Sequence, residues 1–418
     1  MSKSPQTPIM LESDVVISGG GPVGLMLAIG LAQQGQQVVL AEQSAASAEK
    51  ETSSAFDGRV LALSHGSMVM LRALGVWQDL EPFLTEIHHV HVSQKGYLGI
   101  TKLHAQEVGV PALGYSIQSS HLGEVLWQHI NEYEKKTKTK TEQDVSLETS
   151  GHITVLRPAS LIDFEMDEHR VLAQIKADER DYQVQAKLIV GADGTQSKVR
   201  TVLDLPIEEK SYNAFGVIAQ IETEFHPENW SYERFTEQGP VALLPMQGHA
   251  HKAVLVCPED AVEAVKALSN EAFITLFASK MGERLGAFTH VSPRVVYPLK
   301  ETYVPQMAKG RALLMGNASH TQHPVAAQGL NLGIRDIQVF LEQMNRLDIG
   351  LPEGLTAYAD ARKPDHEKVM GLTDGLIQIF QHTSPVVGHL RGLGMMAMQA
   401  MPSVKRRFSR FAMGGQNR

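Results

Sequence analysis

A glycine-rich turn near the start of the chain constrains the fold more than any other feature. Residues 14–42 read DVVISGGGPVGLMLAIGLAQQGQQVVLAE, in which Gly19, Gly21 and Gly24 have the spacing G-x-G-x-x-G. The β-branched run before the turn predicts a buried parallel strand, and the apolar run after it predicts a helix. Val38 to Ala41 predicts a second strand. This order is typical of a βαβ unit that binds a dinucleotide.

The three glycines and the acidic residue that closes the unit have distinct parts in such binding. Gly19 permits the tight turn, Gly21 lets a pyrophosphate approach the backbone, and Gly24 lets the helix pack closely on the strand. The first N–H groups of the helix are unpaired and partially positive, which suits phosphates. Glu42 follows the second strand, where a carboxylate accepts hydrogen bonds from the ribose hydroxyls of an adenosine. The alternative is a tight strand–helix turn without a ligand.

The composition indicates a large globular protein. A chain of 418 residues suggests two or three domains, and 43% hydrophobic residues are ample for a core. A formal net charge of -8 argues against a nucleic-acid partner. The single cysteine, Cys257, excludes an internal disulfide, a cysteine-based zinc site and a C-x-x-C redox pair. We expect it to pack as a small hydrophobic side chain.

Export and membrane-insertion signals are missing from the sequence. Residues 1–12 are polar, and no apolar run approaches the roughly 18 residues of a membrane span. We therefore expect a cytoplasmic protein. The one biased segment, EKKTKTKT at residues 134–141, is typical of a solvated surface loop. Further strands are expected between the motifs, including a single strand from Tyr182 to Val190.

Two later motifs each follow an apolar strand and enter a turn of small residues. The first follows Leu188 to Val190 and runs Gly191-Ala-Asp193-Gly-Thr-Gln-Ser, with Arg200 shortly after. The second spans residues 311–333 and reads RALLMGNASHTQHPVAAQGLNLG. Together they would place a second and a third backbone loop against the first glycine turn.

With the first turn, these motifs resemble those of the group A flavoprotein aromatic hydroxylases. GADGxxSxxR at 191–200 is similar to the family motif associated with FAD and the nicotinamide donor. Residues 316–333 are similar to the loop whose polar residue holds the ribityl chain and whose backbone amides face the pyrimidine end of the flavin. The resemblance implies FAD as cofactor, NAD(P)H as a transient reductant, O₂ as co-substrate and a C4a-hydroperoxyflavin as the hydroxylating species.

One departure from the family pattern indicates a branch of it. Most relatives have Asp at the second position of the Gly316 motif, whereas this chain has Asn317. Asn still accepts a hydrogen bond from a ribityl hydroxyl but brings no charge, so weaker retention of FAD is expected. With Gly329-Leu-Asn-Leu-Gly-x-Arg-Asp336, the variant resembles the ubiquinone-biosynthesis branch, in particular its 2-polyprenyl-6-methoxyphenol hydroxylases. Other similar stretches are 74–77, 90–93, 233–236, 239–240 and 244–246.

The branch implies a reaction and a set of partners. The implied reaction converts 2-polyprenyl-6-methoxyphenol to 2-polyprenyl-6-methoxy-1,4-benzoquinol. A phenol is nucleophilic at its free para position, so we expect no metal site. The alternatives are another ring position, a soluble aromatic substrate, or a flavin-binding subunit of a biosynthetic complex. Partners are then a polyprenylated phenol, O₂ and NAD(P)H, with the inner-membrane surface, a ubiquinone-biosynthesis complex and a homo-oligomer left open.

The motifs and the resemblance assign candidate site residues. The adenosine and pyrophosphate candidates are Gly19, Gly21, Gly24 and Glu42. The flavin-side candidates are Arg59, Gln118, Asp193, Gly316, Asn317, Gly329, Leu330 and Asn331. Arg59 would meet the pyrophosphate or form a surface ion pair, and Asp193 would contact the cofactor or cap a helix. His323 either assists deprotonation of the phenol or packs the loop, and Pro324 would shape the wall on the substrate side.

We predict an α/β fold of the p-hydroxybenzoate-hydroxylase type, with an α+β substrate part. A Rossmann-like FAD-binding domain would comprise residues 1–80, 115–205 and 300–345, interleaved with a mixed-sheet substrate domain of 81–114 and 206–299. Residues 346–418 would form a helical C-terminal region. There, Leu390 to Met401 is rich in Leu and Met, and the basic run from Lys405 to Arg410 follows. This segment is either a capping helix pair or an amphipathic segment that docks on a membrane or a partner.

Overall fold

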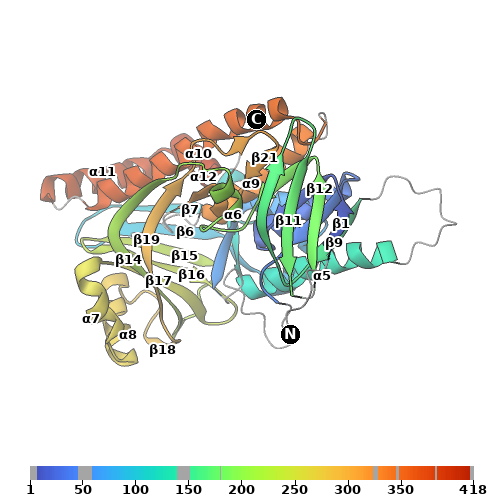
Figure 1. The fold of residues 1–418 in the computed structure, drawn as a ribbon. Coiled ribbons are helices and arrows are strands. Elements are labelled where there is room, and N and C mark those ends of the chain that lie inside the picture. The colour runs from blue at the N-terminus through green and yellow to red at the C-terminus, as the bar shows by residue number, and fades with distance from the viewer. Residues whose placement is uncertain are drawn as a thin grey trace.

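The computed structural model describes residues 7–45, 59–138, 151–178, 180–322, 328–344, 348–381 and 384–414. Two parts that contain sheets lie side by side, and the C-terminal helices, orange to red, run along one side of the molecule (Figure 1). The architecture is therefore α/β with a helical C-terminus, as predicted. The division into domains stays a proposal.

A mostly parallel sheet carries the first glycine turn. Its strand order is β20-β21-β13-β2-β3-β9, and every neighbouring pair except β20–β21 is parallel. The strands are β2 (Val15–Ser18), β3 (Gln37–Ala41), β9 (His152–Leu156), β13 (Leu188–Gly191), β20 (Ala308–Lys309) and β21 (Ala312–Leu314). Helices α1 (Pro22–Gln33), α5 (Ser119–Lys138) and α9 (Gly329–Met344) accompany it, and α1 contacts both of the others. Because helices cover such a sheet, its strands are continuous apolar runs.

A larger mixed sheet forms the second part. Its order is β22-β19-β14-β17-β16-β15-β6-β7, with β18 paired to β14. The strands are β6 (His89–Gln94), β7 (Ile100–His104), β14 (Glu208–Thr223), β15 (Trp230–Thr236), β16 (Gly239–Pro245), β17 (Ala250–Pro258), β18 (Phe288–Val291), β19 (Val295–Tyr303) and β22 (His320–Thr321). Helices α7 (Val262–Lys266) and α8 (Asn270–Met281) supply Val262, Phe273 and Phe277 to a core shared with this sheet. Cys257 is buried in the same core, as expected.

Two smaller sheets complete the strands. One has the order β1-β12-β11-β10, and the other has the order β4-β8-β5. Their members are β1 (Ile9–Glu12), β4 (Val60–Ser64), β5 (Thr85–Ile87), β8 (Gly114–Gln118), β10 (Ala159–Met166), β11 (Val171–Ala177) and β12 (Asp181–Ala186).

The single strand expected from Tyr182 to Val190 is wrong. It is two strands in different sheets, β12 and β13, separated at Lys187. Lys187 is exposed and forms an ion pair with Asp14 at 2.9 Å. The backbone N–H groups of Lys187 and Leu188 both donate to the Asp14 carbonyl, which redirects the chain from one sheet to the next.

The remaining helices join the strands, and α4, α10 and α11 contact the larger sheet. They are α2 (His65–Ala73), α3 (Trp77–Leu80), η1 (Glu81–Phe83), α4 (Ala105–Val108), α6 (Lys198–Val202), η2 (Glu259–Ala261), η3 (Gly316–Ala318), α10 (Pro352–Gln381), α11 (Pro385–Ala400) and α12 (Pro402–Ala412). Helix α11 packs on β7, and α12 packs on α4. In the described part of the chain, no helix has the length and apolarity needed to cross a bilayer.

Candidate active site

The three motif turns meet at one edge of the parallel sheet. Strands β2, β13 and β21 are adjacent and parallel, and the ends of all three are in register, with Gly191 opposite both Ser18 and Leu314. The carboxyl ends of parallel strands therefore place the turns that follow them side by side. Ligands of open α/β sheets bind in the crevice at this edge.

Close backbone approaches explain why glycine stands at the key positions. Gly19 has φ +110°, and a Cβ on it would lie 2.4 Å from the carbonyl oxygen of Ala192. A Cβ on Gly24 would lie 2.0 Å from the carbonyl oxygen of Gly19. Gly316, at φ +57°, would bring a Cβ within 2.9 Å of Val23 on α1. A larger residue at Gly19 would push the first turn from the second, one at Gly316 would push the third turn from α1, and one at Gly24 would distort the first turn itself.

Glu42 lies against the first glycine turn, as its place after β3 predicts. Its Oε2 accepts the backbone N–H of Gly20 at 2.5 Å, and its Oε1 accepts the backbone N–H of Ser44 at 2.7 Å. These bonds hold the carboxylate beside the N-terminus of α1, whose cap residue is Gly21. Each carboxylate oxygen retains further acceptor capacity for a ribose hydroxyl.

Asp193 and Arg200 connect the second motif to its neighbours. Asp193 Oδ2 accepts the backbone N–H of Lys198 at 2.8 Å and the hydroxyl of Ser18 at 3.3 Å. Arg200 donates to the carbonyl of Ala318 at 3.0 Å and so joins the second motif to the third. Asp193 is thus used in part as a turn and cap residue, which is the alternative considered above. Its Oδ1 is buried and has no partner in the described part of the chain.

Asn331 connects the third motif to β4. Its Oδ1 accepts the backbone N–H of Ser64 at 2.8 Å and the hydroxyl of Ser67 at 2.7 Å, and its Nδ2 donates to the carbonyl of Ala62 at 2.9 Å. The amide of Asn331 therefore forms its hydrogen bonds within the protein. A contact of this residue with a cofactor remains a prediction for its backbone. Gly329 and Leu330 form the first turn of α9 with it.

The other candidates have the following positions. The side chain of Asn317 is exposed on η3, Gln118 is half-buried at the end of β8, and Arg59 is exposed just before β4. His323 and Pro324 lie outside the described residues, so the roles assigned to them stay predictions.

These residues fit a bound FAD. The glycines let the three motif turns pack closely at one edge of the sheet, and the N-terminus of α1 there offers unpaired N–H groups to a pyrophosphate. The buried Asp193 Oδ1 and Ser119 Oγ have no partner among the described residues, and buried polar atoms normally have one. The exposed Asn317 amide is able to accept from a ribityl hydroxyl. When bound, FAD supplies the redox chemistry that activates O₂.

A cavity of about 540 Å³ reaches the third motif, because Gln328 and Asn331 belong to its wall. This volume is in the range of sites for small organic molecules. The sheet side of the wall includes Val92, Phe235, Ala242, Leu244, Val254 and Val256. The helix side includes Leu376, Ile379, Met395, Met398, Phe408 and Met413. The lining is predominantly apolar, and β16 and β17 supply part of it.

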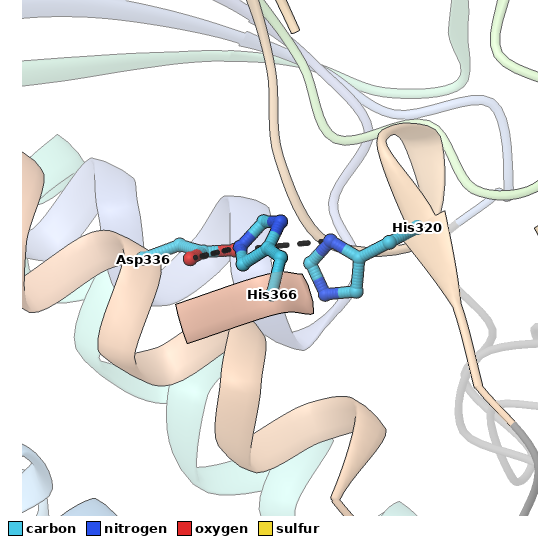
Figure 2. A group of neighbouring side chains, drawn as sticks. All are labelled: His320, Asp336 and His366. Atoms are coloured by element: carbon cyan, nitrogen blue, oxygen red, sulfur yellow. Dashed lines mark hydrogen bonds and ion pairs between the residues drawn. The ribbon is translucent and has the colours of Figure 1, made fainter. Parts of the chain in front are cut away.

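A buried cluster of three potential metal ligands lies beside the third motif (Figure 2). The ligand atoms of His320, Asp336 and His366 all lie within 4.8 Å of one another. Asp336 Oδ1, however, accepts from Arg362 Nε at 2.7 Å and pairs with His366 Nε2 at 2.8 Å. A guanidinium at this distance disfavours a cation, so we interpret the cluster as a hydrogen-bonded connection between α9 and α10, against which the His320 ring of β22 packs.

The electrostatics of the cluster agree with this interpretation. Burial lowers the pKa of His320 to about 3, so that this imidazole is neutral at neutral pH. Burial alone would raise the pKa of Asp336, but the nearby histidines and Arg362 hold it below its ordinary value. The ionised carboxylate therefore compensates the buried guanidinium.

The sequence matches the model of the FAD binding domain family over residues 12–373. The chain belongs to this family. The ubiquinone hydroxylase UbiL of Rhodospirillum rubrum is 30% identical over 407 residues, which cover 96% of this chain and 90% of that protein. The 3-demethoxyubiquinol 3-hydroxylase of Escherichia coli is 28% identical over 410 residues, covering 96% and 98%.

A solved structure agrees with the architecture. The p-nitrophenol 4-monooxygenase PnpA of Pseudomonas putida has a TM-score of 0.74 and 15% identity, covering 98% of this chain and 100% of that chain. At this identity the likeness shows the fold alone. With the family match and the relatives, the protein is an FAD-dependent aromatic monooxygenase, and the predicted family resemblance is confirmed.

Sequence reasoning missed two parts of the site. The first is the helix side of the cavity wall, which residues 376–413 supply from far along the chain. The second is Glu233, whose stretch was noted only for its similarity to relatives. The available signal was the alternation in β15, which puts this charged residue on the same face as Ser231 and Phe235.

Proposed function

We propose that this FAD-dependent monooxygenase hydroxylates the ring of a polyprenylated phenol during ubiquinone biosynthesis. The observation that carries the proposal is the apolar cavity, which extends from Asn331 in the third motif to Met398 and Phe408 in the C-terminal helices. A phenol ring at the motif end leaves the rest of this cavity for an apolar tail. The relatives named as ubiquinone hydroxylases support the same substrate class.

Several residues of the chain serve this reaction by excluding water and fixing the ring. Val254 and Ala242 on the sheet side and Met395 and Met398 on the helix side form apolar walls. Such walls exclude water from the reacting atoms and thereby suppress unproductive reduction of O₂ to peroxide. NAD(P)H is proposed as the reductant. Since the chain has one G-x-G-x-x-G motif, NAD(P)H would use a groove shared with FAD.

We propose the 2-polyprenyl-6-methoxyphenol ring as the substrate and its para position as the site of hydroxylation. The expected result is phenol-stimulated NAD(P)H oxidation with matching O₂ uptake and formation of the 1,4-benzoquinol, measured on FAD-loaded protein with a short-chain substrate. A product hydroxylated elsewhere on the ring would reassign the position. Preferential turnover of an unprenylated aromatic would contradict the prenylated substrate. NAD(P)H oxidation without any hydroxylated product would contradict hydroxylation and favour a flavin-binding subunit.

We also propose that the outer face of α11 and α12 docks on an anionic membrane. Val386, Leu390, Leu393 and Met396 are exposed on α11 at helical spacing, with Leu390 60% exposed. The opposite face of the same helix contributes Met395 and Met398 to the cavity. Exposed arginines follow on α12, at positions 406, 407 and 410. In a chain of formal net charge -8, this local positive charge complements anionic lipid.

A further inference from the structure

Strand β15 presents one carboxylate to the apolar cavity. Ser231, Glu233 and Phe235 alternate along the strand and all line the cavity. In the sheet, Glu233 is in register with Val92 on β6 and with Ala242 on β16. Ala242 is in turn in register with Val254. The carboxylate therefore belongs to a row in which the three other side chains are apolar.

Glu233 has no compensating partner in the described part of the chain. No side chain there donates a hydrogen bond to it, and no cation lies close enough to shift its pKa. The two cations of the cavity wall bond to backbone instead, since Lys252 donates to the carbonyl of Val60 at 2.6 Å and Arg391 donates to the carbonyl of Ile379. Burial raises the pKa of Glu233 to about 7.

An uncompensated carboxylate in an apolar wall is unfavourable for folding. Such groups occur where function requires them, because a base is most effective when its pKa lies near the working pH. Lys252 lies two residues from Val254 along β17, on the same face of the sheet, and contacts β4 through Val60. Asn331 holds the same strand from the cofactor side. Glu233 is thus one row away from the part of the wall that joins the motif end of the cavity.

We propose that Glu233 binds the phenol hydroxyl of the substrate and accepts its proton when the ring reacts. In this step the phenol O–H bond breaks, its electron pair stays on the phenolate oxygen, and a carboxyl O–H bond forms. The phenolate is the stronger nucleophile at the para carbon. The carboxyl group returns the proton to solvent after the product leaves. This inference rests on the proposed function, since it requires a phenol in the cavity.

Binding to the oxidised, FAD-loaded protein tests the hydrogen bond without turnover. The probe is 2-farnesyl-4-methylphenol, whose para position is blocked, and the matched control ligand is its methyl ether. By calorimetry, the unchanged protein should bind the phenol several-fold more tightly than the ether. That preference should fall between pH 8 and pH 5.5 as Glu233 becomes protonated. In Glu233→Gln the preference should not depend on pH, and in Glu233→Leu it should be lost.

Turnover and thermal unfolding give two further readouts. Glu233→Gln should lower hydroxylation of the reactive substrate by about 10²- to 10⁴-fold, the range for loss of a general base, with unchanged FAD content. It should also raise the Tm at pH 8 and have less effect at pH 5, because it removes a charge that the apolar wall disfavours. The control Glu222→Gln changes an exposed glutamate on β14 and should alter none of these quantities.

Three outcomes would overturn the inference. Equal binding of phenol and ether by the unchanged protein would exclude the hydrogen bond, and a pH-independent preference would exclude Glu233 as its acceptor. Full turnover by Glu233→Gln would exclude Glu233 as the base that accepts the phenol proton. Any of these results, with hydroxylation intact, leaves the proposed function standing. If the unchanged protein neither binds the probe phenol nor hydroxylates the reactive substrate, both the role of Glu233 and the proposed function are overturned.

Discussion

At the residue scale, the glycines were the most predictable part of the site. Their positions follow from backbone geometry, and contacts such as the one between Gly24 and the Gly19 carbonyl leave no room for a side chain. Side-chain roles were less predictable. The side chain of Asn331 bonds to Ala62, Ser64 and Ser67, a role that the motif did not indicate, and the cofactor contact expected of this residue stays a prediction. Sequence spacing cannot reveal a bond between residues that lie more than 260 positions apart.

Asn317 offers a prediction at this scale. Its side chain is exposed and has no partner among the described residues, so its replacement should leave the fold unchanged. Asn317→Asp should preserve or tighten FAD binding, because both side chains accept from a ribityl hydroxyl. Asn317→Leu should weaken binding by about 1–3 kcal/mol, since it leaves that hydroxyl unpaired. Fluorescence titration of apo-protein with FAD measures the three affinities.

The control for Asn317 is a change elsewhere on the surface. Glu353→Leu alters an exposed residue in the first turn of α10 and should bind FAD as the unchanged protein does. Equal affinities for Asn, Asp and Leu at position 317 would show that this side chain does not contact the cofactor.

At the element scale, α11 has features of both structures predicted for the C-terminal region, a capping helix and an amphipathic docking segment. Its inner face packs as a cap, because Gly388 and Gly392 let the helix approach residues 97–99 closely. The hydroxyl of Thr101 also donates to the carbonyl of Met395 at 3.1 Å. Its outer face remains apolar and exposed. The richness of this segment in Leu and Met was visible in the sequence, but the assignment of each face depends on tertiary packing.

One basic residue of the region does not belong to the proposed membrane surface. Lys405 begins the basic run, but it is only 4% exposed and donates to Glu107 at 2.7 Å. The ion pair attaches α12 to α4. The exposed charge therefore comes from Arg406, Arg407 and Arg410. A charge count from sequence includes a residue that the fold has already neutralised.

The membrane proposal gives the prediction at this scale. Changing Arg406 and Arg407 to Glu should lower the affinity of the protein for anionic vesicles by at least about tenfold, since each basic residue near such a surface contributes about 1 kcal/mol. The measurement is co-sedimentation with phosphatidylglycerol-containing vesicles at low and high salt. Turnover of a short-chain soluble phenol should be unchanged, whereas turnover of a long-chain substrate in vesicles should fall.

A matched charge reversal distinguishes surface location from net charge. Lys176→Glu with Arg180→Glu makes the same change at the far end of β11 and in the turn after it, and it should not affect vesicle binding. If both double variants bind the vesicles equally weakly, the loss of binding results from net charge and not from a docking surface on α11 and α12. If the Arg406 and Arg407 variant keeps both vesicle binding and long-chain turnover, α11 is a structural cap or faces a protein partner.

At the scale of the whole molecule, the fold class was predictable and the arrangement was not. The βαβ unit and the later strand–turn motifs are local patterns, and they account for the parallel sheet. The cavity has no local signature. It requires the pairing of β15 with β6, whose residues lie more than 130 positions apart, and coverage of that sheet by helices at the end of the chain. The hydrophobic periodicity of the sequence does not predict which distant segments pair in this way.

Buried histidines contribute to the dependence of the stability of the fold on pH. Burial lowers the pKa of His91 and of His251 to about 4, and that of His320 to about 3. In the unfolded chain the pKa of histidine is near 6.5. Below that pH the unfolded state takes up protons that the folded state does not. Stability contributed by these residues is therefore present above about pH 6.5 and is lost progressively as the pH falls toward 4.

We predict that the free energy of unfolding falls between pH 7 and pH 5, with each histidine contributing up to about 1.4 kcal/mol per pH unit. Glu233 opposes this trend, because its raised pKa makes the folded state lose stability as the pH rises from about 4.5 to about 7. His251→Gln should reduce the slope by about one histidine's contribution, whereas Glu233→Gln should steepen it. Urea denaturation at several pH values measures both slopes, with the exposed His169→Gln as control. A slope that His251→Gln leaves unchanged would mean that this imidazole takes up its proton at the same pH in the folded protein as in the unfolded chain.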